Sequence, residues 1–151
     1  MTLTAPALFI DTNIPIYAAG REHRYKRFCQ RIILLVAEHH QDFVTSSAVL
    51  QEIIHYYLAS RRWSEGRGIL REFVGTMSGR IESVHADDAA LAAELAGLHP
   101  NVNAQDLVHT AVMRRLGIAR IISADTDYDR IDGVERLDPA NLDQWKTTLQ
   151  L

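Results

Sequence analysis

The chain has 151 residues, of which 47% are hydrophobic and 23% charged, so it can form one substantial core and is too apolar for a disordered protein. Its net charge of -3 argues against a broadly basic nucleic-acid binder. Cys29 is the only cysteine, which excludes an intrachain disulfide and a multi-cysteine zinc site. No apolar stretch reaches membrane-spanning length, and Thr4, Pro6 and Asp11 interrupt any signal-peptide core. We therefore expect a single cytoplasmic domain over residues 1–151.

Short apolar runs alternate with amphipathic segments along the chain. The runs predict buried strands, and the segments carry apolar side chains at helical spacing. The predicted strands are 7–10, 43–45, 81–84, 118–122 and 134–137. The predicted helices are 13–19, 23–39, 48–60, a helix that runs to Met77 after a break at Ser64 and Gly66, 87–98, 104–116, and a C-terminal helix with Trp145. Strands that alternate with helices indicate an α/β architecture with a central, mainly parallel sheet.

Four acidic residues occupy comparable places in this scheme. Asp11 and Asp125 each follow a predicted strand, and the carboxyl ends of parallel strands meet at one edge of a sheet. Glu52 and Asp106 lie near the starts of two predicted helices, which can point toward the same edge. Asp11 can equally be a turn residue that precedes an N-cap at Asn13.

The other three acidic residues also have ordinary structural explanations. Glu52 can be a partly exposed helix residue. Asp106 can be the third residue of a helix whose N-cap is Asn103, and Asp125 can form an Asx turn. The sequence pattern leaves these alternatives open at each position.

Convergence of the four carboxylates would raise some of their pKa values, and a bound divalent cation would remove that conflict. Oxygen ligands without cysteine or a paired histidine motif favour Mg²⁺ or Mn²⁺ over zinc. Such sites are typical of phosphate-ester chemistry. His109 follows Asp106 by one helical turn and could contact the site, although an isolated histidine is more often structural.

Positive charge is concentrated in two segments of the chain. Such clusters are typical of solvated helix faces, but a nucleic-acid enzyme can use one of them to hold phosphates. The clusters are Arg21, Arg24, Lys26, Arg27 and Arg31, and Arg61, Arg62, Arg67 and Arg71.

Four stretches carry a resemblance to a known family: Phe9-Ile10-Asp11-Thr12-Asn13, Glu52 in its helix, Ala104-Gln105-Asp106-Leu107-Val108-His109, and Ile122-Ser123-Ala124-Asp125-Thr126-Asp127-Tyr128. In this order and spacing the chain resembles PIN-domain proteins, and most of all the VapC-type toxins of toxin–antitoxin pairs. The resemblance implies a three-layer α/β/α fold and Mg²⁺- or Mn²⁺-dependent cleavage of RNA. It also implies a small antitoxin partner and a homodimer.

Carried over by position, the resemblance implies that Asp11 and Asp106 are the main metal ligands. Glu52 would complete the metal and water network, and Asp125 would serve a second metal or its water shell. Asp127 could share or replace the role of Asp125. Residues implied to support these ligands are Thr12, Asn13 and Ser46.

Our interpretation is a metal-dependent endoribonuclease that acts as a toxin. The first alternative is a catalytically silent PIN-like module that binds RNA or protein, against which the intact acidic set argues. The second is a DNA or flap nuclease, which the same chemistry permits. The spacing between Asp11 and Glu52 is long beside compact relatives and suggests an extra helix or loop within 21–39, which could alter the RNA groove or antitoxin docking.

Overall fold

The structure, a computed structural model, describes residues 7–151; residues 1–6, with the predicted interruptions at Thr4 and Pro6, lie outside the described range. The described strands form a sheet in the order β3-β2-β1-β4-β5, and all of these neighbours pair in parallel. The strands are β1 (Leu8–Ile10), β2 (Phe43–Ser46), β3 (Ile81–Glu82), β4 (Arg120–Ile122) and β5 (Glu135–Leu137). The helices are α1 (Asn13–Ala19), α2 (Lys26–Glu38), α3 (Ser47–Ala59), α4 (Trp63–Thr76), α5 (Ala86–Leu98), α6 (Ala104–Leu116) and α7 (Leu142–Thr148). Residues 7–151 also form three 3-10 helices, η1 (His40–Asp42), η2 (Thr126–Arg130) and η3 (Pro139–Asn141).

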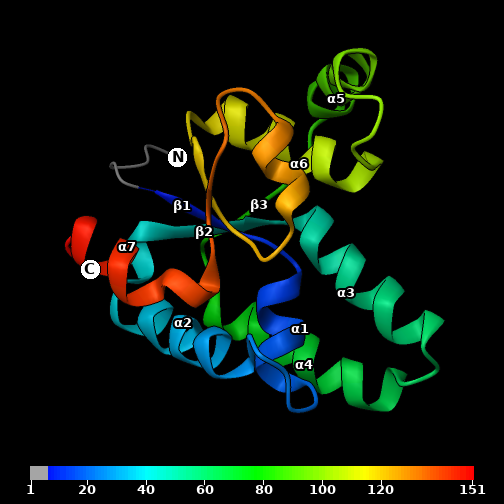
Figure 1. Ribbon diagram of the computed structural model, residues 1–151. Coiled ribbons are helices and arrows are strands. Elements are labelled where there is room, and N and C mark those ends of the chain that lie inside the picture. Colours follow the sequence, from blue (N-terminus) through cyan, green and yellow to red (C-terminus); the bar gives the residue numbers. More distant parts are fainter. Residues whose placement is uncertain (1–6) are drawn as a thin grey trace.

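Helices cover both faces of this sheet. In Figure 1, α5 and α6 lie on one side of the strands, and α1, α2, α4 and α7 lie on the other. Leu8 of β1 is opposite Phe43 of β2 and Arg120 of β4, so these three strands end at the same edge. The predicted three-layer α/β/α arrangement with a parallel sheet is therefore confirmed.

The central strand β1 explains why short apolar runs signal strands in this chain. Its residues Leu8, Phe9 and Ile10 have no exposed surface. A strand with helices on both faces needs apolar side chains in both directions, so its sequence shows a continuous run and no alternation. The run ends where the chain leaves the sheet, and Asp11 is the first residue beyond it.

One predicted boundary is wrong. Helix α4 runs through Ser64 and Gly66, where we predicted a break, and the chain turns earlier, at Arg61, whose φ of 56° is left-handed. Gly66 is needed for packing and not for a turn. A Cβ atom at Gly66 would lie 2.4 Å from the Cβ of Tyr57, so the missing side chain lets α4 approach α3 closely.

Other boundaries differ by a few residues. The predicted helix 23–39 begins only at Lys26, and the predicted strand 81–84 is two residues long. Such shifts are usual because helix and strand ends depend on local hydrogen bonds more than on apolar spacing. Within residues 7–151, no helix combines the length and the apolar character needed to cross a membrane.

We predict that Gly66→Ala lowers the free energy of unfolding by about 1–3 kcal/mol, because the new methyl group overlaps the buried Tyr57. Gly68→Ala is the matched control in the same helix, since a Cβ atom there meets nothing within 4 Å. Its better helix propensity should leave stability unchanged or raise it by up to about 1 kcal/mol. Urea unfolding measures both, and equal effects of the two substitutions would contradict the packing explanation.

Candidate active site

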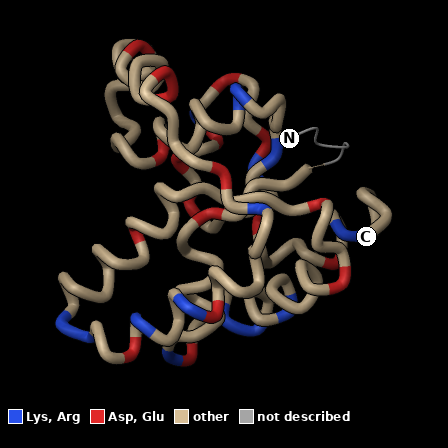
Figure 2. Tube along the Cα trace, turned by 180° about the vertical axis from the view of Figure 1, so that it is seen from behind, with Lys and Arg blue, Asp and Glu red and all other residues tan. Residues whose placement is uncertain are grey.

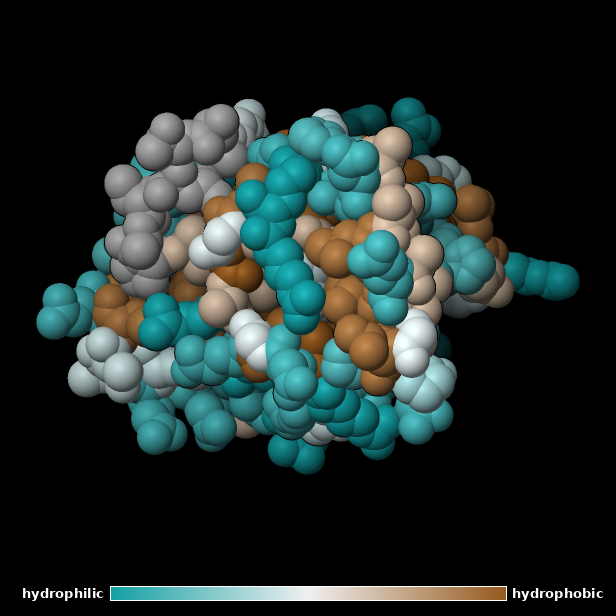
Figure 3. Space-filling view, turned by 90° about the horizontal axis from the view of Figure 1, so that it is seen from above, coloured by the Kyte–Doolittle hydropathy of each residue, from teal (hydrophilic) through white to brown (hydrophobic). Residues whose placement is uncertain are grey.

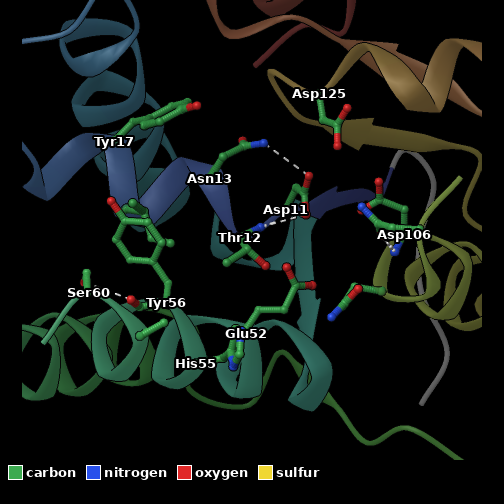
Figure 4. Close-up of a pocket in the computed structure, with 14 residues that line it drawn as sticks. Asp11, Thr12, Asn13, Tyr17, Glu52, His55, Tyr56, Ser60, Asp106 and Asp125 are labelled. Carbon is green, nitrogen blue, oxygen red and sulfur yellow. Dashed lines mark hydrogen bonds between the residues drawn. The ribbon is translucent and has the colours of Figure 1, made fainter. Parts of the chain in front are cut away.

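A cleft of about 610 Å³ opens at the carboxyl edge of the sheet. Its walls come from the start of α1, from α3, from the start of α6 and from the loop after β4. Figure 4 shows acidic side chains from these separate elements around one cavity. The structure thus brings together all four acidic residues singled out in the sequence, namely Asp11, Glu52, Asp106 and Asp125.

Asp11 is buried and held by three donors. Its Oδ1 accepts a hydrogen bond from the backbone N–H of Thr12 at 2.8 Å, and its Oδ2 accepts one from the hydroxyl of Ser123 at 2.6 Å. The side-chain amide of Asn13 donates to the same Oδ2 at 3.3 Å. The predicted N-cap role of Asn13 is wrong, because α1 already begins at Asn13 and its side chain is engaged with Asp11.

Ser123 links the ends of β1 and β4. Besides donating to Asp11, its hydroxyl oxygen accepts from the amide of Asn13 at 3.1 Å and from the backbone N–H of Asp125 at 3.0 Å. Asn13 also accepts from the backbone N–H of Ala124 at 3.3 Å. The sequence analysis quoted Ser123 without giving it a role, because a serine after a strand is an ordinary turn residue and its partner lies 112 residues away.

Asp106 has one satisfied and one unsatisfied carboxylate oxygen. The predicted N-cap is confirmed, since the side chain of Asn103 accepts from the backbone N–H of Asp106 at 2.9 Å. The carboxylate of Asp106 points elsewhere: its Oδ1 accepts from the hydroxyl of the buried Tyr128 at 3.0 Å. Its Oδ2 is buried and has no hydrogen-bond partner within the described residues.

Asp125 and Asp127 complete a compact acidic group. The predicted Asx turn is confirmed, because Oδ1 of Asp125 accepts from the backbone N–H of Asp127 at 2.9 Å and this turn starts η2. Ligand atoms of Asp106, Asp125 and Asp127 lie within 4.8 Å of one another. Asp127 therefore lies close enough to share a cation with Asp125, a possibility that the sequence had left open.

Glu52 projects from α3 and contacts His109 of α6. The Nε2 atom of His109 is hydrogen-bonded to Oε1 of Glu52 and lies 3.8 Å from Oδ1 of Asp11. His109 has no exposed surface, whereas the side chain of Glu52 is 26% exposed and faces the cleft. His109 is thus part of the site, which its lone position in the sequence could not establish. His55, also given little weight from the sequence, lines the outer cleft.

Burial disfavours the charged form of two of these carboxylates, Asp11 and Asp106. Burial raises the pKa of Asp11 in spite of the opposing effects of His109 and Ser123. Burial, together with the neighbouring Asp11 and Asp125, raises the pKa of Asp106 to about 8. Burial also opposes the charged form of His109, but its bond to Glu52 and the charge of Asp11 outweigh this, and the pKa of His109 is raised.

The donor set fits a hard divalent cation. Carboxylate oxygens are the usual protein ligands of Mg²⁺ and Mn²⁺. The unpartnered Oδ2 of Asp106 is a buried acceptor that such an ion would satisfy. Two predicted supporting residues, Thr12 and Ser46, have buried hydroxyl oxygens without hydrogen-bond partners among residues 7–151.

A parallel α/β/α sandwich with carboxylates gathered at the strand ends defines an α/β protein with an acidic site of the cation-binding type. The PIN domain family model matches residues 8–134. Ribonuclease VapC13 of Mycobacterium tuberculosis is 31% identical over 135 residues, which cover 86% of this chain and 98% of the relative. Ribonuclease VapC23 of the same species is 34% identical over 118 residues, covering 78% and 92%.

Solved structures agree with this fold. VapC20 of Mycobacterium tuberculosis, described as a Sarcin-Ricin loop cleaving toxin, superposes with a TM-score of 0.67 at 20% identity and covers 82% of this chain and 94% of its own. DNA-bound VapBC from Salmonella typhimurium has the same TM-score at 18% identity, with 88% and 98% covered. The chain belongs to the PIN-domain family. The two relatives named above, which it matches over nearly their whole length, are VapC ribonucleases.

We predict that Asp106→Asn stabilises the protein in EDTA at pH 8. The folded state keeps a proton on Asp106 up to about pH 8, whereas the unfolded chain releases it near pH 3.8. Unfolding therefore releases a proton between these pH values, so this group makes stability fall as pH rises from about 4 to 8. Asparagine carries no cost of ionisation. The free energy of unfolding of the variant should therefore exceed that of the parent by about 1 kcal/mol or more at pH 8, and this difference should vanish near pH 4.

Thermal unfolding as a function of pH measures this difference. Asp87→Asn is the control. Both aspartates lie in the first turn of a helix, α5 for Asp87 and α6 for Asp106, but Asp87 is exposed whereas Asp106 is buried. A variant Asp106→Asn that is less stable than the parent at pH 8 would refute the prediction.

Proposed function

We propose that the chain is a Mg²⁺- or Mn²⁺-dependent endoribonuclease and the toxin of a toxin–antitoxin pair. One observation carries this proposal: acidic side chains from four separate elements converge in a solvent-open cleft, and Oδ2 of Asp106 lacks a partner there within the described chain. A buried cluster of carboxylates is unfavourable without a cation. The relatives' names support RNA as substrate, and the solved toxin–antitoxin complexes support an antitoxin.

Asp11, Asp106, Asp125 and Asp127 would hold the cation, and Glu52 would complete its network of water. When bound, a divalent ion lowers the pKa of an attacking water and stabilises charge that develops on phosphate oxygens. The ligand set extends the four residues expected from the sequence by Asp127, whose carboxylate belongs to the compact group.

The chain's own residues would position the reacting groups. Glu52 is a partly exposed carboxylate of the cleft, as Asp125 is, and is placed to accept the proton of a water molecule. His109 orients Glu52 through its Nε2 atom, which also lies 3.8 Å from Oδ1 of Asp11. The three donors on Asp11 fix the direction of its carboxylate oxygens before any ligand binds.

An antitoxin segment would cover an apolar cleft of about 440 Å³ between α1, α2 and α4. Leu34 lies in its wall and is 65% exposed, so the cleft offers apolar surface to a partner. We propose a homodimer as well. Figure 3 looks down on the side that carries α5 and α6, where apolar side chains lie between hydrophilic ones, and Leu98 at the end of α5 is 75% exposed.

We predict that the purified chain cleaves single-stranded RNA with Mg²⁺ or Mn²⁺ and that EDTA abolishes cleavage. Asp11→Asn and Asp106→Asn should each lower the rate at least 100-fold, because each removes a ligand charge. Asp87→Asn, at an exposed position in the first turn of α5, should cleave at the parental rate. Gel assays on RNA and DNA of one sequence separate a ribonuclease from a DNA or flap nuclease.

Calorimetric titration with Mn²⁺ separates an enzyme from a catalytically silent module. The parent should bind Mn²⁺ and Asp106→Asn should bind it at least 10-fold more weakly. Full nuclease activity of Asp106→Asn, or cleavage that survives EDTA, would count decisively against the proposed chemistry.

We predict that Leu34→Asp reduces co-purification with the product of a small reading frame next to this chain's gene by at least 10-fold. A charge in an apolar interface is left desolvated without a partner. Leu58→Asp is the control, since Leu58 is 55% exposed and lies outside that cleft. Undiminished co-purification of Leu34→Asp would place the antitoxin elsewhere.

A further inference from the structure

The carboxylate cleft continues into a second cavity of about 570 Å³. The two cavities share four wall residues, of which Tyr17 of α1 and Tyr56 of α3 are aromatic. Beyond them, the second cavity is lined by the loop from Gly20 to His23 and by Arg62. A linear polymer that occupies the acidic cleft can therefore extend past these two tyrosines. The shared residues are Ile16, Tyr17, Tyr56 and Ser60.

Tyr17 is held in a stack of rings. Its ring centroid lies 4.5 Å from that of His23, with 21° between the planes, and 5.9 Å from that of Tyr25, with 8° between the planes. The guanidinium of Arg24 lies 4.7 Å from the centre of the Tyr25 ring. This aromatic wall is therefore fixed before a ligand binds, which reduces the entropy that binding would cost.

Tyr56 forms the facing aromatic surface on α3. Its ring packs edge-on against the buried Tyr57, at 4.9 Å between centroids and 90° between planes, yet 42% of Tyr56 remains exposed. Figure 4 shows Tyr17 and Tyr56 on one side of the pocket, with Asp106 on the other. A large exposed ring with a rigid support beside a polar cleft is suited to stacking on a planar group.

Positively charged side chains enter the lining of the second cavity. The first holds the carboxylates, whereas the second is lined by Arg21 and Arg62, with Glu22 as the opposing charge. Arg62 is already paired with Glu65, through hydrogen bonds of 2.8 and 3.0 Å. Arg21 is exposed and has no ion pair or hydrogen bond with any residue in the described part of the chain. Figure 2 shows further Lys and Arg residues around the lower helices and the outer end of the α3–α4 hairpin.

We propose that the second cavity is a nucleotide subsite in which an unpaired RNA base stacks on Tyr56 and Tyr17 and its phosphate pairs with Arg21. This inference rests on the proposed ribonuclease function, because it adds a binding step to the same cleft. Stacking on aromatic rings requires a base whose faces are free, so the subsite selects single-stranded or looped RNA over duplex. Arg21, the first residue of its basic cluster, thereby acquires a role besides solvation.

Fluorescence anisotropy tests the subsite without cleavage. The probe is a fluorescein-labelled, single-stranded RNA decamer of mixed sequence in Mg²⁺ buffer, and every protein also carries Asp106→Asn so that the RNA stays intact. Tyr56→Leu should weaken binding about 10-fold, because it removes the stacking surface. Tyr56→Trp should bind within about twofold of the parent, since it keeps an aromatic face. Leu58→Ala, two residues further along α3 and outside both cavities, should bind like the parent.

The phosphate contact is tested by salt dependence. Arg21→Gln should reduce the slope of log affinity against log salt by about 0.7, the value for one phosphate contact to a single strand. Arg120→Gln is the control, because Arg120 begins β4 at the edge of the sheet opposite the carboxyl ends. Circular dichroism of each variant verifies folding.

Three outcomes would overturn the subsite: no measurable binding of the decamer by the parent, equal affinity of Tyr56→Leu and the parent, or binding of the duplexed decamer as tight as that of the single strand. A wild-type chain that cleaves RNA while Tyr56→Leu binds normally would reject the subsite alone. A wild-type chain that cleaves no RNA would reject the proposed function, and the titration would still decide the subsite.

Discussion

Confinement of like charges at one edge of a parallel sheet is the constraint on which the other features of this site depend. Asp11 and Asp106 are each only 4% exposed, and burial opposes the ionisation of both carboxylates. Donors around Asp11 offset part of this cost, as does the Tyr128 hydroxyl beside Asp106. The remainder is unrelieved at the Oδ2 atom of Asp106, so the fold holds an arrangement whose natural complement is a positive ion.

The hydrogen bonds that hold the carboxylates in place join residues that are distant in sequence. Ser123 joins the end of β4 to Asp11 at the end of β1, and Asn13 joins α1 to both. Since each of these small side chains makes several hydrogen bonds, the two strand ends cannot move apart without losing them together. Rigid support of this kind keeps acidic groups in place in the absence of a ligand.

Much of this organisation could be predicted from local sequence. A buried parallel strand needs an apolar run, and an edge of the sheet that faces a ligand needs polar residues after that run. Asp11 and Asp125 could therefore be recognised as candidate site residues. The contact between Glu52 and His109 was not, because it depends on how α3 crosses α6. The path of α4 through Gly66 was mispredicted for a similar reason: glycine marks a close approach as readily as a break, and only the packed Tyr57 distinguishes them.

Helix α3 carries Glu52 and, one turn later, Tyr56, and α4 packs tightly on α3 at Gly66. Four residues of α-helix span about 6 Å along the helix axis. With the proposed function and subsite, the helix would set a fixed distance between the site of hydrolysis near Glu52 and the base stacked on Tyr56. On that proposal, scission would fall at a constant offset from the stacked base, whichever sequence surrounds it.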